Sequence, residues 1–125
     1  MIDIDKQIAY WKTGAADDLE SAKILIKSNR LLHGLFFCHL VIEKAIKAHV
    51  VKQIQEIAPR SHNLLYLAEI AELQFEEDDE IFLGILMKYQ LQGRYPDYNP
   101  IIPTETKVMD YLIRTEKLLS WLLMK

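Results

Sequence analysis

The sequence predicts an all-α protein, an up-and-down bundle of about five helices in a single domain that spans residues 1–125. Three observations predict this fold class. Apolar residues recur at steps of three and four along most of the chain. Half of the 125 residues are hydrophobic, so a core can form without a disulfide or a metal. Four glycines and four prolines are too few for a disordered chain or a β protein with many turns.

The first helix is predicted from a single apolar stripe near the N-terminus. Gly14 weakens this helix locally by roughly 1 kcal/mol relative to alanine. Ser28 to Arg30 form the turn that follows it. The residues of the stripe, which we expect to face the core, are Ile4, Ile8, Trp11, Ala15, Leu19, Ala22 and Ile26.

The second helix, predicted over residues 31–57 and ended by Pro59, is apolar around most of its circumference. Such a helix must be buried on more than one side. One interpretation is that a second copy of the protein covers part of it, which predicts a homodimer with this helix near the interface. The alternative is a central helix that the other four helices surround.

One polar stripe crosses this second helix. His39, Glu43 and Lys47 are four residues apart, so they stack on one face. One interpretation is a ladder of ion pairs, each worth a few tenths of a kcal/mol. The other is a polar wall that lines a groove.

The remaining three helices follow from caps and apolar spacing. The third begins near His62 or Asn63, with Ser61 as its N-cap. The acidic run FEEDDE is a solvated connection whose last acids favour the start of the fourth helix. Thr104 caps the fifth helix. The residues expected to be buried are Leu64, Leu67, Ala68, Ala71, Ile81, Phe82, Ile85, Leu86, Tyr89, Val108, Leu112, Leu119 and Leu122.

Charge and composition exclude several classes of protein. The net charge of −3 gives no general support for nucleic-acid binding, which depends on Lys and Arg neutralising phosphates. The single cysteine, Cys38, cannot form an internal disulfide, which fits a reducing compartment. MIDIDKQIAY lacks the features of a signal peptide, and the apolar runs are shorter than a membrane span. We therefore expect a soluble, cytoplasmic protein.

The sequence predicts neither a metal site nor a cofactor. The four histidines form no HExxH motif and have no paired cysteine or dense carboxylate cluster beside them. The four glycines are scattered singly, so no glycine-rich phosphate loop is present.

Four segments in a fixed order resemble a HEPN domain, the family named for higher eukaryotes and prokaryotes nucleotide-binding. They are YWKTGAADDLESAK, FFCHLVIEKAIKAHVV, SHNLLYL and GRYPD, and the resemblance runs from about Ile8 to Leu122. It implies a four- or five-helix bundle that forms dimers, with a groove near the dimer axis. It also implies three uses: ribonuclease toxins, partners of a minimal nucleotidyltransferase, and nucleotide-binding or interaction modules.

The ribonuclease members of that family carry an Arg followed a few residues on by a His. Arg94 matches the first of these, but Asn99, Pro100 and Ile101 occupy the places where the His is expected. Asparagine has no proton that titrates near neutrality, so it cannot act as a general base. This departure argues against the usual metal-independent ribonuclease. His62 is a substitute if it approaches Arg94 in space; otherwise it is a polar contact at the start of the third helix.

Arg94 itself has two interpretations. In the first it pairs with Glu43 or Asp97 and holds its loop in place. In the second its guanidinium faces a phosphate or carboxylate, and Tyr95 stacks on a base. The candidate ligand contacts are therefore Arg94, His62, Lys47, Glu43, His39 and Tyr95.

These observations lead to two hypotheses about function. The first is a non-catalytic HEPN-domain binding module, a homodimer that binds a nucleotide-like anion or a protein partner such as a minimal nucleotidyltransferase. The alternative is a divergent HEPN ribonuclease toxin of a toxin–antitoxin pair.

Overall fold

The computed structural model describes residues 2–92 and 101–125, and these residues form five α-helices and no strand. The all-α class predicted from the sequence is confirmed. The helices are α1 (Ile4–Lys27), α2 (Leu31–Ile54), α3 (Leu64–Ile70), α4 (Glu77–Gln92) and α5 (Glu105–Met124). None of these helices combines the length and the apolar character needed to span a membrane.

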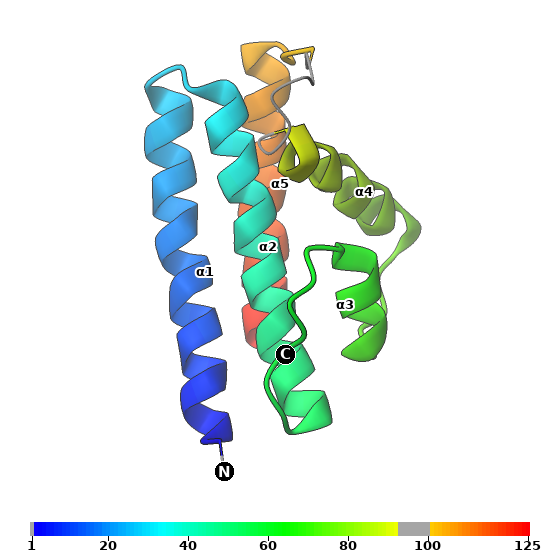
Figure 1. The fold of residues 1–125 in the computed structure, drawn as a ribbon. Helices are drawn as coiled ribbons and strands as arrows, with labels where there is room; N and C mark the ends of the chain where they lie inside the picture. The colour runs from blue at the N-terminus through cyan, green and yellow to red at the C-terminus, as the bar shows by residue number, and fades with distance from the viewer. Residues whose placement is uncertain (1, 93–100) are drawn as a thin grey trace.

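The second helix is the centre of the bundle. Helices α1 and α2 run antiparallel, and α5 packs against both. The shorter α3 and α4 lie on the side of α2 that is away from α1 (Figure 1). More than half of the α2 residues are buried within the single chain, whereas α1 buries only one stripe. Burial by the chain's own helices therefore explains the apolar circumference of α2. The apolar pattern no longer argues for a second copy, and the homodimer stays a prediction.

Two predicted helix boundaries were wrong because local backbone bonds decide them. Helix α2 ends at Ile54 and not at residue 57, since Gln55 adopts a left-handed conformation (φ 58°) and its N–H bonds the carbonyl of Val51. The N-cap of α3 is Asn63 and not Ser61: its side chain accepts from the N–H of Tyr66. The predicted cap of α5 is confirmed, because Thr104 Oγ1 accepts from the N–H of Lys107.

The buried faces agree with the predicted stripes at most positions. One exception is on α4, where Ile81 is 56% exposed and Leu83 is fully buried instead. Helix α4 packs against α2 and α3, and the buried residues Phe82, Leu83 and Leu86 define its core-facing side.

His49 joins α2 to the end of α5. Its Nε2 donates a hydrogen bond to the carbonyl oxygen of Leu122 over 2.7 Å. Burial lowers the pKa of His49, and the positive charges of Lys12, Lys52 and Lys125 lower it further, while the bond to Leu122 raises it. The folded protein therefore holds this imidazole neutral to lower pH than the unfolded chain does.

We expect His49 to make the protein less stable at mildly acidic pH. Above the unfolded pKa of about 6.5, both states are neutral at this position. As the pH falls below that value, the unfolded chain takes up the proton first, so stability falls until the pH passes the folded pKa. His49→Gln should flatten this dependence in melting temperatures recorded between about pH 8 and about pH 5.

The matched control is His33→Gln, because His33 is exposed. It should leave the pH dependence unchanged. Parallel curves for His49→Gln and the parent protein would show that His49 does not cause the loss of stability at acidic pH.

Candidate functional site

Glu43 lies at the centre of a polar network inside the bundle. Its Oε1 accepts from Nδ1 of His62 over 3.0 Å, and its Oε2 accepts from Nζ of Lys47 over 3.0 Å. The Glu43 side chain is 5% exposed and that of Lys47 7% exposed, whereas the His62 side chain is 40% exposed. The network therefore runs from the interior of the bundle to its surface at His62.

His39 holds the backbone of the same connecting segment. A carbonyl oxygen can only accept, so Nε2 of His39 donates to the His62 carbonyl over 3.1 Å. Its Nδ1 lies 3.6 Å from Glu43 Oε1. His39 and Glu43, one turn apart on α2, therefore hydrogen-bond the main chain and the side chain of His62.

Lys47 is directed into the bundle. Its ammonium lies 5.1 Å from the centre of the Trp11 ring, in addition to its ion pair with Glu43. The positions four apart on α2 place the three polar side chains on the same face, as the sequence predicted. Their depth was not predicted, and it changes the energetics, because a buried charge is stable only when it is paired.

The orientation of His62 has a chemical consequence. A carboxylate only accepts, so Nδ1 of His62 carries the proton in its bond to Glu43. In the neutral ring the lone pair then resides on Nε2.

His62 lines a cleft of about 370 Å³ between the α2–α3 connection and the end of α4. That volume is within the range of small-ligand sites, which runs from about 300 to about 1,000 Å³. Apart from His62, the lining residues are Arg60, Ser61, Asn63, Met87 and Gln90.

The structure brings together four of the six candidate residues. His39, Glu43, Lys47 and His62 belong to one network. The other two, Arg94 and Tyr95, lie outside the described residues, as does Asn99. The ion-pair interpretation of the α2 stripe is right for Glu43 and Lys47, although the pair is buried.

Comparisons with known proteins bear on this arrangement. The family model of the HEPN domain matches residues 8–125. The chain belongs to the HEPN-domain family. The crystal structure of TT1696 from Thermus thermophilus has a similar fold, with a TM-score of 0.76, 22% sequence identity, and coverage of 93% of this chain and 95% of that one. A comparison with curated protein sequences found no match.

The HEPN domain also presents a residue at the cleft that the sequence reasoning missed. Gln90 is buried (6% exposed) near the end of α4 and lines the cleft beside His62. The available signal was its position four residues after the buried Leu86, where the helical period calls for an apolar residue. A polar residue at a core-facing position indicates a hydrogen-bonding role.

The single cysteine of this HEPN domain, Cys38, is buried and does not line the cleft beside His62. Burial raises the pKa of Cys38 to about 11, although Thr115 lowers it slightly, so the thiol is protonated at neutral pH. Within residues 2–92 and 101–125, no three His, Cys, Asp or Glu side chains are placed to hold a metal ion.

Proposed function

We propose that this HEPN domain is a binding module whose ligand, a nucleotide-like anion, occupies the cleft beside His62. The observation that supports the proposal is the fixed orientation of His62 by Glu43 and His39 at the wall of that cleft. A binding site gains affinity when its polar groups are held in place before the ligand arrives.

The lining of the cleft fits the chemistry of a nucleotide. Arg60 supplies a guanidinium, which pairs with phosphate through two parallel hydrogen bonds. Asn63 and Gln90 carry amides that both donate and accept, as the edge of a base requires. The proposed contacts are therefore Arg60, His62 and Gln90. Arg94 stays a contact predicted from the sequence.

Isothermal titration calorimetry with ATP, GTP and a short single-stranded RNA tests the proposal. We expect saturable binding of at least one of these ligands. Arg60→Gln and Arg94→Ala should each weaken it about tenfold, because each removes a hydrogen bond between charged groups.

Arg30→Gln is the matched control, since Arg30 is an exposed arginine in the α1–α2 turn, outside this cleft. It should bind like the parent protein. If all three ligands give no heat and leave the melting temperature unchanged, the proposal of a nucleotide ligand is wrong, and the search moves to a protein partner.

One observation favours the alternative, a divergent ribonuclease. The Glu43–His62 pair has the form of a general base that a carboxylate orients, so His62 is a candidate for the acid–base role that Asn99 cannot take. Incubation of the purified protein with single-stranded RNA distinguishes the two functions. A binding module leaves the RNA intact, whereas a ribonuclease cleaves it and loses that activity on His62→Gln but not on His33→Gln.

A homodimer and a nucleotidyltransferase partner remain predictions from the family. Chromatography with light scattering measures the first. A single species with the mass of one chain at micromolar concentration would contradict it. Co-purification with a nucleotidyltransferase expressed from the neighbouring reading frame measures the second.

A further inference from the structure

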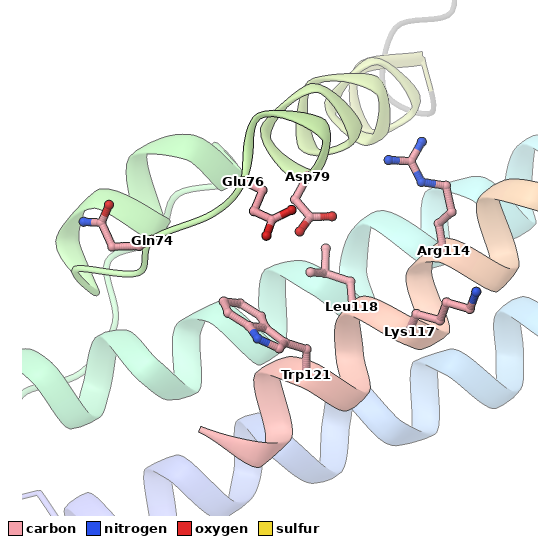
Figure 2. Close-up of a pocket in the computed structure, with 7 residues that line it drawn as sticks. All are labelled: Gln74, Glu76, Asp79, Arg114, Lys117, Leu118 and Trp121. Atoms are coloured by element: carbon pink, nitrogen blue, oxygen red, sulfur yellow. The ribbon is translucent and has the colours of Figure 1, made fainter.

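A second cleft, of about 420 Å³, lies between the start of α4 and the C-terminal half of α5. Figure 2 shows Glu76 and Asp79 extending from the start of α4 toward α5, and Arg114 and Lys117 extending from the neighbouring face of α5. Leu118 and Trp121, on the same face of α5, form its floor. None of the residues in the cleft beside His62 lines this one, so the two sites are separate.

The two walls of this cleft carry opposite charges that do not neutralise each other. Among the described residues, none of the ion pairs involves Glu76, Asp79 or Lys117. Arg114 is held at its wall, because Nη2 donates to the carbonyl of Asp78 over 3.2 Å and its guanidinium lies 4.4 Å from the Phe82 ring centre. The wall charges therefore create a field across the cleft.

Such a field selects ligands by their charge distribution. A simple cation is attracted by one wall and repelled by the other, and the same is true of a simple anion. A zwitterion satisfies both walls at once. The floor adds an apolar contact: Trp121 is 36% exposed, and its ring packs against that of Phe75, with ring centres 5.5 Å apart.

We propose that this cleft binds a short zwitterionic peptide, with its ammonium at Glu76 and Asp79, its carboxylate at Arg114 and Lys117, and an apolar side chain on Leu118 and Trp121. The termini of an extended tripeptide lie up to about 10 Å apart. Among the described residues, α4 and α5 make no close backbone contact and are bridged here by the Arg114 side chain, which leaves room between the walls for a peptide of this length. The proposal stands independently of the nucleotide site.

The probe is the tripeptide glycyl-leucyl-glycine, titrated to millimolar concentration while the indole N–H resonance of Trp121 is followed by NMR. Trp11, the other tryptophan, lies on α1 and serves as an internal control. We expect the Trp121 resonance to shift saturably and the Trp11 resonance to stay. The N-acetylated and C-amidated forms should each bind about two- to fivefold more weakly, as expected for exposed charge pairs.

Two variants assign each end of the peptide to a wall. In Lys117→Gln, amidation of the peptide should weaken binding less than it does in the parent, while acetylation should weaken it as much as in the parent. In Glu76→Gln, acetylation should weaken binding less than in the parent, while amidation should weaken it as much. Lys88→Gln, which changes an exposed lysine elsewhere on α4, should behave like the parent. The proposal is overturned if the free and blocked peptides shift Trp121 equally, or if none of them shifts it at millimolar concentration.

Discussion

Gly34→Ala should lower the free energy of unfolding by about 1–3 kcal/mol, although alanine is the better helix former. Gly34 lies in the first turns of α2, where α1 passes close by. A β-carbon added there would lie 2.3 Å from Cγ1 of Ile26 and 3.4 Å from its backbone nitrogen. Ile26 is itself in the core, so neither group has room to retreat. The cost of overpacking therefore exceeds the gain in helix propensity, which is about 1 kcal/mol.

Gly84→Ala is the matched control for this prediction. Gly84 lies inside α4, and a β-carbon there meets nothing within 4 Å. The same substitution should therefore stabilise the protein by about 0.5–1 kcal/mol. Urea unfolding of the two variants measures the difference in sign.

A double-mutant cycle identifies the cause of the Gly34 effect. In an Ile26→Ala background, which itself costs about 2–5 kcal/mol, the added methyl group has space. Gly34→Ala should then cost little or become favourable. An unchanged cost in that background would show that Ile26 is not the residue that excludes a side chain at position 34.

Glu43→Gln should destabilise the protein by about 3–5 kcal/mol. The substitution keeps the shape of the side chain but removes its charge. Lys47 is 5% exposed, so its ammonium would then be buried without a counter-charge. Lys47→Met should also lower the free energy of unfolding, because it leaves the buried Glu43 carboxylate with one of the two donors that it has in the network. Urea unfolding monitored by circular dichroism measures both.

The double variant Glu43→Leu/Lys47→Met should be more stable than either of its two single variants, Glu43→Leu and Lys47→Met. Replacing a buried ion pair by apolar residues of similar size is often neutral or stabilising. Costs that simply add would contradict a coupled pair. If the network exists to orient His62, the double variant should fold yet bind ATP or GTP more weakly, which separates the role in binding from the role in stability.

Much of the fold was predictable because local periodicity and caps determine it. The stripe on α1 and the Thr104 cap depend on residues within a few positions of one another, and both are as predicted. The errors arose where the local signal was ambiguous. Ser61 and Asn63 are both good N-caps, and only the path of the connecting segment from α2 decides that Asn63 takes the role.

The candidate site was predictable in its members but not in its assembly. The spacing of His39, Glu43 and Lys47 places them on one face of α2, whether that face is buried or exposed. His62 lies 19 residues from Glu43 in the chain, and no short-range pattern specifies that distance in space. Gln90 comes to the same cleft from α4, which is farther still along the sequence.

By itself the sequence determined the helices, their apolar faces and the membership of the HEPN family, because these depend on the order and period of side chains. The tertiary structure alone decided that α2 is surrounded by its own chain, that the Glu43–Lys47 pair is buried, and that residues of opposite charge line the α4–α5 cleft. The physical reason is that burial and pairing depend on which helices meet, and helices with similar apolar stripes can meet in more than one arrangement.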